Sequence, residues 1–289
     1  MRLLDYNSFI NQDGQKVRSV NEHLWSGIIH RSETGRERKE DMIPCDAKED
    51  IQRKIQEIID ETHPKKGDTI DLNNLDVSRV EDMSKLFYDY ERDINFTMYN
   101  FNISKWNVSK VTNMSCMFNA CENFNCDLSR WDVSNVTSMQ SMFYGCEEFN
   151  CDLSRWNVSS VMSMSGMFDG CEEFNSDLSR WNVSSVMSMR SMFCNCENFN
   201  SDLSGWKVSK VMDMQDMFCN CKNFNCDLSG WKVSNVTNMG GMFCNCENFN
   251  SDLSGWDVSK VEVWNMKGMF KGCSSLEKLP DWYHRLGNL

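Results

Sequence analysis

The chain has 289 residues, of which 40% are hydrophobic, and a formal net charge of −12 at pH 7. This acidic balance argues against nucleic acid as the main partner, since nucleic-acid-binding proteins usually present an excess of Lys and Arg. The sequence shows neither an apolar run of ~18 residues nor the apolar core of a signal peptide, so we expect no membrane insertion and no signal-directed export.

The N-terminal part precedes the regular pattern of the chain. Residues 1–47 are polar, charged and aperiodic, and we expect a polar segment or a small subdomain there. A helix is predicted over 48–62, because isoleucines recur at helical spacing and acidic residues occupy the first turn. The isoleucines on one face are Ile51, Ile55, Ile58 and Ile59. Residues 48–70 are therefore interpreted as a capping helix and the lead-in to the repeats.

A tryptophan then recurs every 25 residues. This structural ladder consists of Trp106, Trp131, Trp156, Trp181, Trp206, Trp231 and Trp256. Self-similarity at a period of about 20–50 residues is typical of stacked repeats. We predict a repeat solenoid of about eight rungs over 71–273, in which Leu75 replaces Trp in a degenerate first rung and an insertion within 90–100 loops out. A C-terminal cap is expected over 274–289.

The first complete repeat reads DLSRWDVSNVTSMQSMFYGCEEFNC and runs from Asp127 to Cys151. Its first half, Leu-x-x-Trp-x-Val, has the spacing of a leucine-rich-repeat strand. Its second half has apolar residues at threefold spacing, which suits a 3-10 or short helical turn. The predicted fold is an α/β repeat solenoid, leucine-rich-repeat-like, with a short parallel β-strand and one such turn in each rung.

The consensus DLSxWxVSxVxxMxxMFxxCxxFN resembles the BspA-like branch of leucine-rich repeats, found in mycoplasmas and anaerobic bacteria. The resemblance covers about residues 48–280. It implies a curved solenoid with a bacterial adhesion or protein-interaction role. The missing signal and the many thiols instead favour a cytoplasmic location, with the cell surface or non-classical secretion as the alternative.

Thirteen of the 15 cysteines fall into columns at the repeat period. The first column consists of Cys121, Cys146, Cys171, Cys196, Cys221, Cys246 and Cys273. We interpret it as a small buried filler, because parallel Cβ vectors disfavour disulfides although the rung spacing would allow them. The other columns are Cys126, Cys151 and Cys226, and Cys194, Cys219 and Cys244. The Cys-Asn-Cys triplets lack the usual spacing of zinc ligands, so repeat copying explains them and we expect no metal and no cofactor.

An aspartate column follows the same period, with Asp127, Asp152, Asp177, Asp202, Asp227 and Asp252. A calcium ladder would need several oxygen ligands for each ion. We therefore expect these carboxylates to accept backbone N–H groups in turns. The tryptophans are expected to form a buried aromatic spine, with methionines as adaptable filler.

Variable residues beside each tryptophan are the candidate binding site. Strand alternation would place them on a concave face, where the cations form a stripe. This cation stripe consists of Lys105, Arg130, Arg155, Arg180, Lys207 and Lys232. The outer turns carry glutamates, so we expect a protein partner with an acidic surface, or an anionic glycan. The alternative interpretation is solvated charge that keeps the repeat surface soluble.

No catalytic pattern is visible, and the four histidines lie outside the regular rungs. The sequence therefore predicts a non-enzymatic interaction module that binds through the cation stripe, with an adhesin-like role as one use of this binding. One alternative is an intracellular accessory or scaffold subunit that docks through residues 1–47. Another is a structural spacer.

Overall fold

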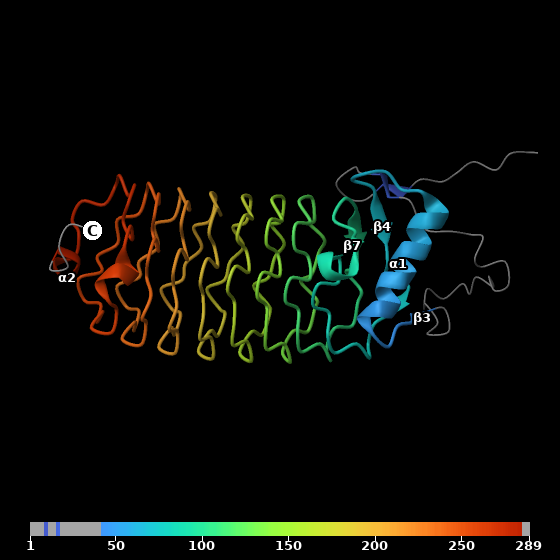
Figure 1. The fold of residues 1–289 in the computed structure, drawn as a ribbon, viewed down its shortest axis with the longest axis horizontal. Helices are drawn as coiled ribbons and strands as arrows, with labels where there is room; N and C mark the ends of the chain where they lie inside the picture. The colour runs from blue at the N-terminus through green and yellow to red at the C-terminus, as the bar shows by residue number, and fades with distance from the viewer. Residues whose placement is uncertain (1–8, 11–15, 18–41, 285–289) are drawn as a thin grey trace, which may run out of the picture.

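In the computed structural model, which describes residues 9–10, 16–17 and 42–284, the chain forms a long stack of coils (Figure 1). Helix α1 (Lys48–Thr62) lies across one end of the stack, and the short helix α2 (Asp281–His284) lies at the other. None of the described helices is long and apolar enough to span a membrane. Most of the predicted segment 1–47 lies outside the described residues.

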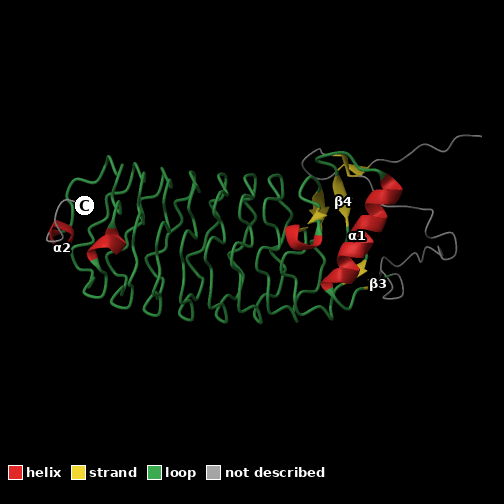
Figure 2. Ribbon diagram, viewed as in Figure 1, coloured by secondary structure: helices red, strands yellow, loops and turns green. Residues whose placement is uncertain are grey.

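The short strands gather at the N-terminal end of the stack (Figure 2). They are β1 (Phe9–Ile10), β2 (Lys16–Val17), β3 (Ile43–Pro44), β4 (Thr69–Asp71), β5 (Leu75–Asp76), β6 (Tyr88–Asp89), β7 (Ile94–Asn95) and β8 (Asn100–Asn102). Strands β3 and β5 pair in parallel, as do β4 and β8, whereas β1–β2 and β6–β7 are antiparallel. The predicted insertion forms the β6–β7 hairpin around a 3-10 turn, η2 (Tyr90–Arg92).

Helix α1 covers the first rung with its apolar face, and its bounds match the predicted helix. Ile51, Ile55 and Ile58 are buried, while Ile59 is partly buried against the same core. The Asp50 carboxylate accepts the backbone N–H groups just before the helix, which satisfies otherwise unpaired donors. The helix ends at His63, whose φ of 46° is left-handed.

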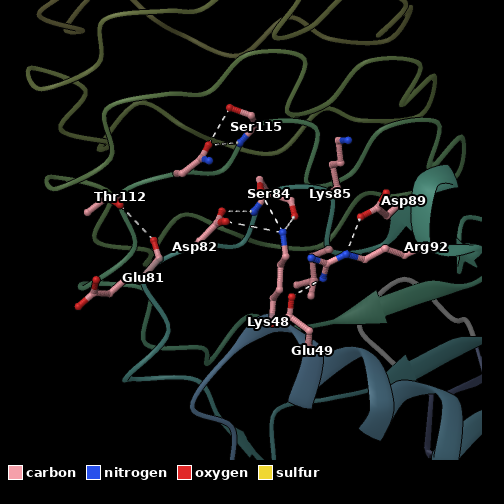
Figure 3. Close-up of polar contacts among 12 residues, drawn as sticks. Lys48, Glu49, Glu81, Asp82, Ser84, Lys85, Asp89, Arg92, Thr112 and Ser115 are labelled. Carbon is pink, nitrogen blue, oxygen red and sulfur yellow. Dashed lines mark hydrogen bonds and ion pairs between the residues drawn. The ribbon is translucent and has the colours of Figure 1, made fainter.

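Polar contacts fix α1 against this rung (Figure 3). The Lys48 ammonium donates to the carbonyl oxygen of Ser84 at 3.0 Å and lies 3.6 Å from the Asp82 carboxylate. Arg92, from the η2 turn, pairs with Glu49 at the start of the helix. The rung beneath the helix and the inserted hairpin therefore both hold the cap in place.

Each regular rung is a succession of β-turns whose end residues point inward. The backbone N–H of residue 131 donates to the carbonyl of residue 128 at 3.0 Å, and the same bond closes the turn 133–136 at 2.9 Å. Further turns follow over 139–142, 143–146 and 146–149. The turn-end residues of this rung are all between 0 and 4% exposed. The apolar residues therefore recur in the sequence at the positions where the β-turns begin and end.

Rungs are joined in parallel along their second half. Single bridges link Asp82 to Asn113 and then continue through the 25-residue column to Asn238. Around each bridge, alternate N–H groups donate to the next rung; Ser141, for example, donates to the carbonyl of Ser165 at 2.8 Å. The pairing therefore lies beside the Met-x-x-Met-Phe segment and not at Leu-x-x-Trp-x-Val, where the described residues form turns. The expected 3-10 turn is likewise replaced by β-turns in the regular rungs.

Two of these turns need a left-handed residue at their third position, as type II turns do. In the rung described above these residues are Ser141, with φ 51°, and Gly145, with φ 69°. The second position is glycine or asparagine in most rungs, the residues that adopt this conformation most readily. Its members in the next rungs are Gly170, Asn195, Asn220 and Asn245.

Aromatic side chains fill the interior in continuous columns. The Trp181 ring stacks between those of Trp156 and Trp206 at 6.5 Å, and its Nε1–H donates to the carbonyl of Leu153 at 3.0 Å. The same inter-rung bond is made by every tryptophan from Trp106 to Trp256. The predicted aromatic spine is confirmed, and it also supplies a hydrogen bond between neighbouring rungs.

The first cysteine column is buried filler, as predicted. Its thiols from Cys146 to Cys246 are fully buried, and each donates to a phenylalanine carbonyl of the preceding rung at 2.9–3.1 Å. In the second column, Cys151 and Ser176 each accept a leucine N–H of the preceding rung at 3.1 Å. That shared acceptor role explains why Cys and Ser alternate there. All 15 cysteines are free.

The C-terminal end closes the stack with one irregular rung. The two-residue insertion forms a 3-10 turn, η3 (Val263–Met266). Trp282, in helix α2, donates its Nε1–H to the carbonyl of Leu253 at 2.9 Å and so continues the tryptophan column. The rings of Trp282 and Tyr283 lie against Phe270. This segment serves as the cap of the last rung.

Candidate interaction surface

The residues of the predicted cation stripe are exposed but sit at turn corners. Arg130, Arg155 and Arg180 are each the third residue of the turn that ends at tryptophan. Lys105 holds the same place one rung earlier, while Lys207 and Lys232 directly follow their tryptophans. In the described part of the chain, the three arginines form no ion pair. The stripe is a solvent-exposed column along the stack, although no extended strand carries it.

The aspartate column lies immediately beside the stripe. The Asp127 carboxylate accepts the backbone N–H of Ser129 at 2.9 Å, and the same bond recurs in every rung down to Asp252. The predicted turn-capping role is confirmed. Because these carboxylates alternate with the arginines, the stripe is less basic than the cations alone suggest.

Hydrogen bonds lower the pKa of these aspartates. In Asp127, Asp152 and Asp202 the serine hydroxyl two residues later is the largest cause and its backbone N–H the second. In Asp177, Asp227 and Asp252 the backbone N–H is the larger cause. A depressed pKa in the folded state stabilises the fold above the unfolded pKa of about 4, and this contribution is lost as the pH falls through the folded value.

We expect the free energy of unfolding to fall as the pH drops from about 4 toward 2, because these carboxylates must then be protonated. Urea unfolding followed at several pH values measures this dependence. The matched variant replaces Asp152, Asp177, Asp202 and Asp227 by Asn, since Asn102, at the same repeat position, already accepts the backbone N–H of Ser104 at 3.4 Å. The variant should fold and show a flatter pH dependence. An unchanged slope would contradict the assignment.

A second exposed column is apolar. Met162, Met187 and Met212 are 46, 42 and 49% exposed, whereas the next methionine of each rung is fully buried. The Met187 backbone N–H donates to the carbonyl of Met162 at 2.9 Å, and Met212 donates to Met187 at the same distance. The three side chains therefore stand next to one another on consecutive rungs.

This column continues toward the C-terminal end through Thr237 to Trp264. Asn265 follows Asn238 in the inter-rung ladder, since its carbonyl accepts the N–H of Met239 at 2.8 Å. Trp264 immediately precedes Asn265 in the η3 turn, and its side chain is 69% exposed at the end of this column. We call Met162, Met187, Met212, Thr237 and Trp264 the Met–Trp ridge. Exposed methionines and aromatics are typical of adaptable protein-binding surfaces.

The ridge and the cation stripe occupy the same stretch of each rung. In the rung around Met187, residues 181–186 separate Arg180 from Met187, and the outer residues of the turn 183–186 are serines. Further along the stack this turn carries exposed lysines, Lys210 and Lys260. Apolar and cationic columns are thus parallel neighbours along the stack.

A pocket adjoins the exposed ring of Trp264 at the end of the ridge. It is lined by Gln215, Asp216, Asn238, Gly240, Trp264 and Lys267, among others. The amide and ammonium groups in this lining can donate hydrogen bonds to a polar side chain beside the apolar ridge.

The glutamate columns lie in another part of the rung, between the cysteine and the following phenylalanine. Glu122, Glu147 and Glu172 are exposed there on consecutive rungs. Lys222 interrupts this acidic surface and pairs with Glu197 at 2.6 Å. Among residues 42–284, no three His, Cys, Asp or Glu side chains converge so as to hold a metal ion.

Sequence reasoning missed the ridge because it treated the methionines as filler. In the segment Val-Met-Ser-Met, the turn ending at Val161 sends Met162 outward and Met164 inward. A signal was present: the position of Met162 is threonine in other rungs, which marks it as exposed. The two-residue insertion concealed that Trp264 is exposed at the end of this column.

These features define a repeat protein whose stacked units present exposed side chains in columns along one axis. A model of the family described as "Mycoplasma protein of unknown function, DUF285" matches residues 54–180 and again 162–283, so the chain belongs to this family. No curated protein and no solved structure matches the chain.

Proposed function

We propose that the protein is a non-enzymatic protein-interaction module, built as a leucine-rich-repeat-like solenoid of the BspA type. The exposure of three methionines on consecutive rungs carries this proposal, because their neighbours in the same segments are fully buried. Apolar side chains that gather on a rigid surface mark interaction sites more often than isolated ones do.

The partner that suits this face is a protein segment with apolar and acidic side chains. Its apolar residues would pack on the Met–Trp ridge, and its carboxylates would meet the cation stripe and the lysines of the intervening turn. The charges would guide encounter and orientation, while desolvation of the ridge would supply most of the affinity. An adhesin-like role is one use of such a face, and an anionic glycan would engage the stripe alone.

Pull-down from an extract of the source cells tests the proposal. The ridge variant replaces Met162, Met187 and Met212 by Thr, the residue that other rungs carry at this position. Because these side chains are exposed, stability should change little. We expect capture of the partner to fall at least about tenfold, the equivalent of ~1.4 kcal/mol.

A second variant reverses the charge of Arg130, Arg155 and Arg180 to Glu, and should weaken capture most strongly at low salt. The matched control reverses Glu122, Glu147 and Glu172 to Arg, three exposed charges outside the proposed face. Equal capture by wild type and both face variants would contradict the proposal. Loss with the control alone would assign binding to the glutamate columns.

A further inference from the structure

All members of the third cysteine column are half-buried, whereas most members of the other two columns are buried. Cys194, Cys219 and Cys244 occupy the same place on three consecutive rungs and are only half-buried. Inter-rung bonds keep these rungs in register: Asn195 N–H donates to the Cys219 carbonyl, and Asn220 N–H donates to the Cys244 carbonyl, both at 2.7 Å. Cys219 lies between Cys194 and Cys244 in this column, and hydrogen bonding from Cys194 first, and also from Cys244, lowers the pKa of its thiol.

The thiols of the first column lie in the same fold but are inert, and they serve as a comparison. Cys196 and Cys221 are fully buried, and each thiol donates a hydrogen bond to a carbonyl oxygen of the preceding rung. Burial raises the pKa of both thiols well above the usual value. The Cys194 thiol, in contrast, donates a hydrogen bond that lowers the pKa of Cys219.

An amide ladder next to the thiols holds their spacing. The Asn195 amide donates to the Asp169 carboxylate at 2.9 Å, Asn220 donates to Asn195 at 2.7 Å, and Asn245 donates to Asn220 at 2.8 Å. Neighbouring rungs of a parallel ladder lie ~4.8 Å apart. This separation is within the Cα range of about 4.4–6.8 Å that a disulfide spans. Because the Cβ vectors of neighbouring rungs are parallel, such a disulfide is strained, and strain makes it easier to reduce.

We propose that these three cysteines form a peroxide-oxidisable site, in which Cys219 forms a reversible disulfide with Cys194 or Cys244. The Cys219 thiolate attacks the hydroperoxide, so that an S–O bond forms, the O–O bond breaks and the alcohol or water leaves with a proton. The neighbouring thiol then attacks the sulfenic sulfur, forming the S–S bond and releasing water. Two thiols are oxidised and one hydroperoxide is reduced.

The linear arrangement makes Cys219 the indispensable member. Either end cysteine can be lost, because Cys219 keeps one neighbour. Without Cys219, the two remaining thiols are two rungs apart, ~10 Å, beyond the reach of a disulfide. Serine should be tolerated at all three positions, since other rungs carry Asn119, Tyr144, Asp169 and Lys271 in this column.

The test treats the full-length reduced protein with hydrogen peroxide, alkylates the remaining thiols and maps disulfide-linked peptides by mass spectrometry. We expect an intrachain disulfide at Cys219 in wild type and in the Cys194→Ser and Cys244→Ser variants. In Cys219→Ser the total yield of intrachain disulfide, including any between Cys194 and Cys244, should fall by about tenfold or more. Cys116→Ser, which removes a half-buried thiol outside the column, should leave the yield unchanged.

Three outcomes would overturn the proposal: no disulfide at Cys219, a disulfide yield that is unchanged in Cys219→Ser, or a disulfide only between chains. Over-oxidation of Cys219 without a disulfide would also overturn it. Far-ultraviolet circular dichroism of each variant confirms that its repeat stack is folded.

Discussion

Replacing Trp181 by alanine is expected to lower the free energy of unfolding by about 4 kcal/mol, the typical cost of removing a buried large aromatic side chain. The side chain is 4% exposed and is stacked between the tryptophans of both neighbouring rungs. Its removal also leaves the Leu153 carbonyl without the indole donor. Urea unfolding followed by circular dichroism measures the loss.

Two controls separate the contributions to this effect. Trp181→Phe keeps an aromatic ring but loses the Nε1–H, so it should cost less, about 1–3 kcal/mol. Arg180→Ala, at the adjacent exposed position, should change stability by no more than about 0.5 kcal/mol. If Trp181→Ala unfolded like wild type, the tryptophan column would not be the spine that the structure shows.

The second large effect is expected from undocking the capping helix. Ile55 is fully buried, and Ile55→Asp would place an unpaired carboxylate between α1 and the first rung. We expect a loss of about 4 kcal/mol, the scale reached when a mutation buries an unpaired charge. In a stack where each rung contacts only its neighbours, the damage should be strongest beside the cap.

Hydrogen exchange tests this locality. The amides of Met83, Lys85 and Phe87, which bond to the next rung, should lose protection in Ile55→Asp. Those of Met214 and Phe218, five repeats further along, should keep most of theirs. The matched variant Gln56→Asp introduces the same residue at an exposed position of the helix. Uniform loss of protection along the chain would contradict the nearest-neighbour account.

Much of the fold is predictable because the same apolar residues return every 25 positions. The capping helix, the tryptophan spine, the buried first cysteine column and the turn-capping aspartates all follow from periodicity and residue chemistry. The location of the parallel pairing between rungs cannot be predicted in this way. Either half of the repeat, Leu-x-x-Trp-x-Val or Val-x-x-Met-x-x-Met-Phe, is compatible with a segment whose apolar side chains face inward. What decides between them is backbone conformation: the left-handed residues at Ser141 and Gly145 align N–H groups toward the next rung.

The candidate surface was only partly predictable for a related reason. The cations beside tryptophan are exposed whether that segment is a strand or a turn, so their exposure was predictable. The backbone conformation of the segment that carries them was not. The outward direction of Met187 depends on where the turn 183–186 ends. Other rungs carry threonine at the repeat position of Met187, and this was the sequence signal that the position is exposed.

The most direct test of the binding face uses a photo-crosslinking amino acid at position 187, on the ridge, and at position 172, among the glutamates. Each protein is irradiated in an extract of the source cells, and cross-linked peptides are identified by mass spectrometry. We expect position 187 to capture a peptide with apolar and acidic residues, and the Arg130, Arg155 and Arg180 charge reversal to reduce the yield of that product, most strongly at low salt. Cross-linking of a specific protein from position 172 but not from position 187 would contradict the account.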